Sequence, residues 1–216
     1  MYQLHIPYIP SLASLSMPEV ANALEDGGVR FTVESLNWPA EFPYRPLTVV
    51  TAAHTDDTLF IDFLVRCNYL RAENYLDNSP VSEDSCVEVY LQPDPQSDRY
   101  FTFEFNCVGV LNSAICSQAS GCAPLPEDQL KRVRRYASVG PRPFREVEGS
   151  FIWSVAVAIP LDIMELKYAG SPLLLRGNFN KCASATSQPH YLSWAPISSA
   201  HPDFHHPESF GKIILD

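Results

Sequence analysis

The feature that most constrains this chain is a period-two alternation of apolar and polar residues that recurs along its length. In Tyr100–Cys107, three phenylalanines alternate with Thr102, Glu104 and Asn106. Successive side chains of a β-strand point to opposite faces, so a segment of this kind buries one face. The same pattern occurs in Thr58–Tyr69, Ser85–Gln92, Ser150–Ile159 and Leu173–Asn180. Short strands of this composition, separated by turn residues, predict an all-β fold of the sandwich type.

Helical signals are few and local. Pro18–Asp26 can form a short helix that Gly27-Gly28 ends, and Pro160–Leu166 can form one further turn. Neither a repeat nor a linker divides the 216 residues. A chain of this size can bury a sizeable core as one sandwich. We therefore expect one domain over residues 1–216, with residues 1–28 as an N-terminal extension that carries the short helix.

Composition and charge exclude several classes of protein. The chain is 46% hydrophobic and 19% charged, which are globular values. No window approaches the about 20 apolar residues of a membrane helix, so we expect no membrane partner. The net charge of −10 argues against a nucleic acid, because neutralising phosphates drives that binding.

The N-terminal segment and the cysteines bear on the compartment. Met1–Pro7 lacks the cationic stretch followed by an apolar one that marks a secretory signal. We expect a cytoplasmic protein, or an extracellular or periplasmic one if a leader has been removed. Of the six cysteines, Cys116 and Cys122 bracket a loop and could pair in an oxidising compartment. The sequence has no CxxC pair, which argues against a thiolate zinc site.

The polar positions of the alternating strands carry amides, carboxylates and guanidinium groups. They are Arg66, Asn68, Glu88, Tyr90, Glu104, Asn106, Arg176, Asn178 and Asn180. These groups make directional, often bidentate hydrogen bonds, which suit vicinal hydroxyls. The same residues could instead form an ordinary solvated face.

Two features of the proline-rich C-terminal third are further candidates. Trp194 offers a flat apolar ring that suits the C–H face of a pyranose, or it anchors its loop to the core. The segment His201–Glu208 holds three His, one Asp and one Glu, which could bind a metal or satisfy local backbone groups.

Catalytic motifs give little support to an enzyme. The sequence has no GxSxG, no HExxH and no phosphate-binding glycine loop. Glu88 and Glu104 could act as a glycosidase pair if their carboxyl groups faced each other at about 5–9 Å.

Several segments, in order over about residues 35–215, resemble the family 9 carbohydrate-binding modules, specifically the standalone bacterial proteins of that type. The matching stretches are Asn37–Pro39, Glu83–Tyr90, Phe103–Gly109, Trp153 ahead of Ile159-Pro160, Gly177–Cys182, Pro189–Trp194 and Pro202–Gly211. The resemblance implies a jelly-roll-like antiparallel β-sandwich that binds sugars without catalysis. It also implies that calcium ions could support the fold.

The resemblance assigns roles to individual residues. Trp194 corresponds to a tryptophan that stacks on the sugar, and Glu88 to a glutamate that holds its hydroxyls. Asn106 and Asn178 lie in strands that supply polar contacts in the family. With Arg176 from the polar strand positions, these five residues form the expected carbohydrate-binding set. A catalytic set is not expected.

One departure concerns a second stacking tryptophan, which lies just before the Asp-Ser segment in the family. Here that stretch is Pro80–Glu83, without an aromatic residue. Losing a stacking ring could cost about 1–2 kcal/mol of binding free energy. Phe42, Tyr44 or Tyr75 could substitute from a neighbouring loop.

The sequence therefore predicts a non-catalytic binder of a sugar or oligosaccharide, linked to carbohydrate catabolism. Three alternatives stay open: a glycoside hydrolase that uses Glu88 and Glu104, a haem or metal binder with His190, His205 or His206 as ligands, and a scaffold whose sugar site has degenerated. The identity of the sugar, the disulfide state and the oligomeric state are not predicted.

Overall fold

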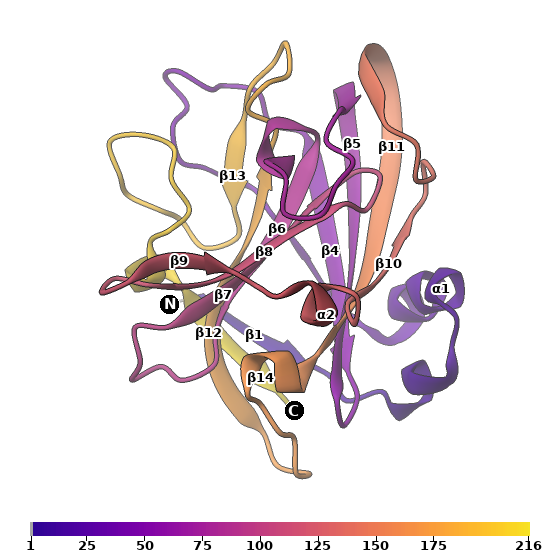
Figure 1. Cartoon of the computed structure of the whole chain (residues 1–216), viewed down its shortest axis with the longest axis vertical. Helices are drawn as coiled ribbons and strands as arrows, with labels where there is room; N and C mark the ends of the chain where they lie inside the picture. The colour runs from indigo at the N-terminus through magenta and orange to yellow at the C-terminus, as the bar shows by residue number, and fades with distance from the viewer. Residues whose placement is uncertain (1) are drawn as a thin grey trace.

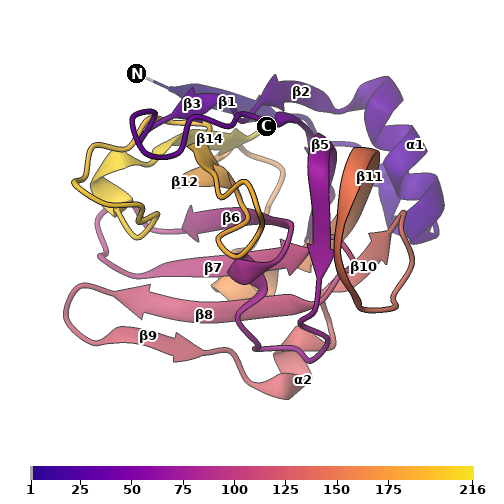
Figure 2. The same cartoon turned by 90° about the horizontal axis from the view of Figure 1, so that it is seen from above.

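A computed structural model describes residues 2–216 as two β-sheets packed face to face. The sheets form two layers in Figure 2, with one helix outside the second layer. The first sheet, sheet A, follows the strand order β1-β14-β12-β6-β7-β8-β9, with β13 and β3 joined beside β12. The second, sheet B, has the order β10-β11-β5-β4-β2. The expected all-β antiparallel sandwich with short helices is confirmed.

Most strand neighbours are antiparallel, and β1 with β14 is a parallel pair. The strands of sheet A are β1 (Gln3–Ile6), β3 (Ser35–Leu36), β6 (Cys86–Gln92), β7 (Tyr100–Asn106), β8 (Leu111–Ser117), β9 (Gly121–Pro124), β12 (Leu173–Cys182), β13 (Tyr191–Ser193) and β14 (Gly211–Leu215). Those of sheet B are β2 (Val29–Thr32), β4 (Leu47–His54), β5 (Thr58–Ala72), β10 (Arg134–Ala137) and β11 (Phe144–Pro160). All five segments predicted from alternation are strands.

The core lies between the two sheets and uses the predicted inward positions. Phe101, Phe103 and Phe105 of β7 are buried there and face the side chains of Phe63 and Trp153 from sheet B. The alternation thus places large apolar side chains in one layer, and burying them is the main stabilising term of such a fold. The other face of β7 carries the polar residues that form the site described below.

Helix α1 (Met17–Gly27) covers the outer face of sheet B, as Figure 1 shows beside β10 and β11. Its N-terminus carries a capping box in which the backbone N–H of Ser16 donates to Glu19, at 2.9 Å. Its apolar stripe, with Val20 and Leu24, packs on Phe60 of β5. Residues 2–28 are therefore integrated into the sandwich, since β1 extends sheet A.

The other helical segments are short. They are the 3-10 turns η1 (Pro10–Ser14), η2 (Val81–Glu83), η3 (Leu161–Met164) and η4 (Pro207–Ser209), and the helix α2 (Glu127–Leu130). The turn predicted over Pro160–Leu166 corresponds to η3. Within residues 2–216, every helix is too short or too polar to cross a membrane. Cys116 and Cys122, on the hairpin of β8 and β9, form a disulfide.

Candidate functional site

A pocket of about 180 Å³ opens on the outer face of sheet A, where β12, β6 and β7 lie side by side. The strands supply Glu88, Tyr90 and Glu104 to its floor. The loop before η4, which carries Phe204 and His205, covers one side. The pocket forms because alternate residues of three adjacent strands point outward and the proline-rich loop folds back over them.

Two carboxyl groups lie on this floor. Glu88 of β6 and Glu104 of β7 are direct cross-strand partners, and both side chains are almost fully buried. Asn180 of β12 pairs with Glu88 on the other side and donates its amide to Glu88 Oε2 at 3.3 Å. Burial raises the pKa of Glu88 well above its usual range, and the neighbouring Cys182 and Glu104 raise it further.

Hydrogen bonds hold Glu104 in place from both flanking strands. The hydroxyl of Tyr90 donates to Glu104 Oε1 at 2.9 Å, and the amide of Asn112 donates to Oε2 at 2.8 Å. Each carboxylate oxygen can accept more than one hydrogen bond. Both oxygens of Glu104 are thus oriented, and each keeps capacity for a ligand hydroxyl.

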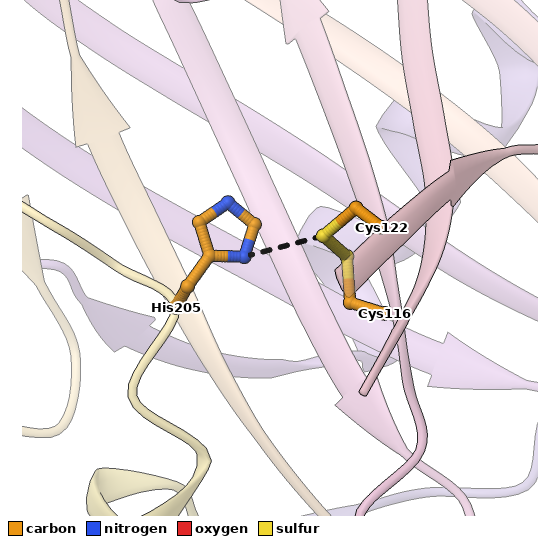
Figure 3. A group of neighbouring side chains, drawn as sticks. All are labelled: Cys116, Cys122 and His205. Atoms are coloured by element: carbon orange, nitrogen blue, oxygen red, sulfur yellow. Dashed lines mark hydrogen bonds between the residues drawn. A yellow bond between two sulfur atoms is a disulfide. The ribbon is translucent and has the colours of Figure 1, made fainter. Parts of the chain in front are cut away.

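Aromatic rings form the walls of the pocket. Tyr90 lies in the floor, and Tyr191 and Phe204 lie in the wall. The imidazole of His205 lies 5.2 Å from the ring of Tyr90, centroid to centroid. Figure 3 shows this imidazole beside the Cys116–Cys122 disulfide, with Nδ1 3.9 Å from Cys122 Sγ. A flat sugar face can therefore meet an aromatic side chain in this pocket without a tryptophan.

The position of Trp194 corrects the expectation of a loop-borne platform. Its side chain is only 7% exposed and packs on Phe179 and Phe31 at the core. Tyr2 meets the indole edge-on at 5.5 Å and covers its outer side. The ring fits because Gly211 has no side chain: a Cβ there would lie 2.5 Å from the indole. Trp194 thus anchors its loop, which was the alternative interpretation.

The two predicted asparagines are also structural. Asn106 is fully buried and donates to Asp84 and to the carbonyl of Asn74, while its oxygen accepts from the backbone of Val108 and Val110. These bonds close the turn after β7. Hydroxyls of a ligand would have to displace them, at the cost of leaving buried groups unpaired.

Asn178 has an equivalent role on β12. It is fully buried, donates to the carbonyl of Ala195 and accepts from the backbone N–H of Ala195. These two bonds hold the segment after β13 against β12. Asn106 and Asn178 therefore bond to the protein itself and lie outside the lining of the pocket, and their assignment to sugar binding stays a prediction.

Arg176 lies on the same strand as Asn178 but faces a different cavity. Its guanidinium donates to Gln92 and to the carbonyls of Glu208 and Phe210. That cavity, of about 350 Å³, lies next to Tyr2 and Lys212. The structure therefore leaves Glu88 as the one predicted binding residue in the pocket on β6 and β7.

Other expected groups lie apart from the pocket. Arg66 and Asn68 belong to β5 and hence to sheet B. Of the three proposed substitutes for the second tryptophan, Phe42 packs on Tyr191, Tyr44 packs on His190, and Tyr75 is exposed elsewhere. Phe42 contacts the aromatic wall through Tyr191 and is not among the residues that line the pocket. Ser82 lies in the Pro80–Glu83 stretch, where the family has its second tryptophan, and it does line the pocket.

The histidines proposed as haem or metal ligands already have partners. His190 has Lys181 on Nε2 and the carbonyl of Gln188 on Nδ1. The Nδ1 atoms of His205 and His206 bond to Tyr100 and Glu208. Burial, followed by the charge of Lys181, lowers the pKa of His190 well below its usual range.

The groups of side chains that could bind a metal ion do not suit calcium. Residues 2–216 contain two groups of three or more His, Cys, Asp or Glu side chains close enough to share an ion, and both include two cysteines. Calcium takes oxygen ligands, so neither group fits it. In one of them, Cys116, Cys122 and His205, the sulfurs are already joined in the disulfide of Figure 3.

Comparison with known proteins decides the family. The model of carbohydrate-binding family 9 matches residues 19–215. The chain belongs to this family. Family 9 modules bind carbohydrate and are non-catalytic. No curated protein matches the chain.

Solved structures agree with this family 9 assignment. A candidate carbohydrate-binding protein from Bacteroides uniformis is 30% identical, with 98% of each chain covered and a TM-score of 0.92. Two structures of a family 9 module from Caldicellulosiruptor kristjanssonii are 13% identical. The complex with glucose has a TM-score of 0.65, and the match covers 98% of this chain and 94% of that one. The complex with cellotriose has a TM-score of 0.63, and the match covers 98% of this chain and 92% of that one. At that identity the likeness shows the fold.

Sequence reasoning missed most of the pocket. Tyr90 and Glu104 were among the polar strand positions, and the alternation signals them. Tyr191 and Phe204 lie in segments with an irregular pattern, where nothing in the sequence tells an outward ring from a buried one. Cys182 looks like a small buried residue, and only strand pairing shows that it reaches the pocket.

Proposed function

We propose that this protein binds a small sugar or the end of an oligosaccharide, without catalysis, in the pocket over β6 and β7. The observation that carries the proposal is the pair of buried, oriented carboxyl groups of Glu88 and Glu104 beside the rings of Tyr90, Tyr191 and Phe204. Carboxylates accept hydrogen bonds from vicinal hydroxyls, and aromatic faces accept the apolar side of a pyranose.

The size of the pocket favours a short ligand. Its volume of about 180 Å³ is below the roughly 300–1,000 Å³ typical of pockets for drug-sized ligands. The family 9 structures with glucose and cellotriose support sugars of the glucose series as the first ligands to test. A role in carbohydrate catabolism would follow from capture of such a ligand.

The hydrolase alternative uses the same two carboxyl groups, which share one face of sheet A. The bonds from Tyr90 and Asn112 to Glu104, and from Asn180 to Glu88, orient both groups equally well for a ligand hydroxyl or for a water. Family membership favours binding over hydrolysis.

The test is calorimetric titration with glucose, cellobiose and cellotriose. Glu104→Gln should weaken the best ligand about 10- to 100-fold, because hydrogen bonds to a charged group contribute about 1.5–3 kcal/mol. Glu165→Gln, on an exposed turn beside Arg99, is the matched control and should bind like the wild type. Equal affinity of Glu104→Gln and wild type would refute the proposed site, and release of reducing sugar would favour the hydrolase.

A further inference from the structure

Two cysteines and one glutamate meet at the floor of the pocket. Cys86 begins β6 and Cys182 ends β12, and the two are direct cross-strand partners. Glu88 follows two residues after Cys86, so its side chain points to the same face. The two sulfurs and a carboxylate oxygen of Glu88 all lie within 4.8 Å of one another. None of the three residues is more than 1% exposed.

The spacing of these atoms matches a tetrahedral metal centre. Bonds of about 2.3 Å to sulfur and about 2.0–2.2 Å to oxygen, at a tetrahedral angle, separate a sulfur from an oxygen by about 3.6 Å. The observed separations from Glu88 Oε1 are 3.0 Å to Cys182 Sγ and 3.9 Å to Cys86 Sγ. A cation bound to all three atoms therefore requires Oε1 and Cys182 Sγ to move apart by about 0.6 Å and Oε1 and Cys86 Sγ to approach by about 0.3 Å.

The surroundings orient the carboxyl group and leave a path to solvent. Asn180 donates to Glu88 Oε2, so Oε1 is the atom turned toward both sulfurs. The amide oxygen of Asn180 is buried and has no hydrogen-bond partner within residues 2–216. Glu88 and Cys182 both line the pocket, which provides an entry route and a fourth coordination position. An oriented carboxylate and an entry route are what a metal site needs.

The absence of a CxxC pair does not exclude this arrangement. That motif brings two thiols together through a local turn, whereas here the antiparallel register of β6 and β12 does so across 96 positions of sequence. The other two free cysteines, Cys67 and Cys107, are not part of the group and belong to the core between the sheets.

We propose that Cys86, Cys182 and Glu88 form a binding site for a thiophilic divalent cation, namely zinc. The fourth coordination position of the metal faces the pocket. On binding, both thiols release their protons to solvent, and the Glu88 carboxyl group releases its proton where it holds one. Two metal–sulfur bonds and one metal–oxygen bond form, so no electron transfer is involved. The hydrogen bond from Cys182 to Glu88 is replaced by bonds from both residues to the metal. The inference does not depend on the proposed sugar binding, although both use Glu88.

The experiment titrates the purified full chain with Co²⁺ alone, without sugar and under mild reduction. Cobalt reports its own ligands: we expect one equivalent, a thiolate charge-transfer band in the near ultraviolet and intense tetrahedral bands in the visible. Zn²⁺ should displace it. Cys86→Ser and Cys182→Ser should weaken cobalt binding at least about 100-fold, more than loss of an outer-shell partner does. Cys67→Ala and Cys107→Ala are the matched controls and should retain the spectrum.

Alkylation of the wild-type chain provides a test that needs no variant. Zinc should protect Cys86 and Cys182 from a thiol reagent, while Cys67 and Cys107 react at an unchanged rate once the chain is opened by mild denaturant. Each of three results would overturn the proposal: cobalt binding without a thiolate band, cobalt binding that survives in both serine variants, or a Cys86–Cys182 disulfide in the isolated protein under mild reduction. Sugar binding measured with a chelator present tests the proposed function separately.

Discussion

At the scale of single residues, Trp194 shows how a missing side chain positions a large one. Gly211 of β14 leaves the space that the indole fills, and Tyr2 covers the remaining edge. Because the ring contacts Phe179 in the core, its contribution is to stability. The residue that the sequence nominated as the sugar platform therefore acts on the fold, and the two roles predict different mutant behaviour.

Trp194→Ala should lower the free energy of unfolding by about 3–5 kcal/mol, because it leaves a large cavity in a packed core. Gly211→Ala should lower it by about 1–3 kcal/mol, because the new methyl group clashes with the indole. Urea unfolding monitored by tryptophan fluorescence and circular dichroism measures both changes. Sugar affinity of folded Gly211→Ala should equal that of the wild type, and a selective loss of affinity would restore the stacking role.

At the scale of elements, helix α1 seals a carboxyl group against strand β5. Asp62 lies on the outer face of sheet B, 8% exposed, and its Oδ1 has no hydrogen-bond partner in the described residues. Burial, and then the charge of Glu25 on α1, raises the pKa of Asp62 from 3.8 to about 6. Packing of α1 on Phe60 gains apolar contacts, and the same packing buries the carboxyl group of Asp62 without a hydrogen bond to Oδ1.

The raised pKa of Asp62 determines whether the free energy of unfolding rises or falls with pH. A carboxyl group whose pKa is raised on folding destabilises the fold as pH rises from 3.8 to about 6, and the full penalty applies above that range. A shift of about two units corresponds to about 3 kcal/mol. Asp62→Asn should thus raise the unfolding free energy by up to about 3 kcal/mol near pH 8 and change it little near pH 4. Asp98→Asn, on an exposed loop, is the control for urea titrations at both pH values. A gain that is equal at the two pH values would contradict the burial argument.

At the scale of the whole molecule, the sequence was informative where a property is local and uninformative where it is long-range. Alternation found five strands of the core, β5, β6, β7, β11 and β12, because the side-chain period of a strand needs no partner. It did not find β4 or β8. It could not distinguish Asn178, which ties a loop to β12, from an asparagine that faces a ligand. It found Glu88 and Glu104, because both lie on the polar side of their strands. It could not bring Cys86 next to Cys182, since that pairing depends on the register of β6 and β12.

The packing of the two sheets on each other buries one positive group between them. Lys181 of β12 is 1% exposed, and its Nζ lies 5.8 Å from the centre of the Trp153 ring in sheet B. The ammonium donates to the carbonyl of Cys182 at 2.6 Å and bonds to His190 at 2.9 Å. Burial lowers the pKa of Lys181 below its usual 10.5. The stability of the packed sheets therefore depends on pH through the protonation of Lys181.

The sign of that coupling follows from proton binding. The unfolded chain holds the Lys181 proton up to the ordinary pKa of 10.5, and the folded chain releases it at lower pH. Raising the pH toward 10.5 therefore favours the folded state, by at most about 1.4 kcal/mol for each pH unit between the two pKa values. Lys181→Met retains the length of the side chain and removes the titration. The unfolding free energy of the wild type minus that of Lys181→Met should rise as pH increases toward 10.5, as measured by urea unfolding. Lys212→Met, on the exposed side of β14, should show no such trend, and parallel profiles for wild type and Lys181→Met would contradict the prediction.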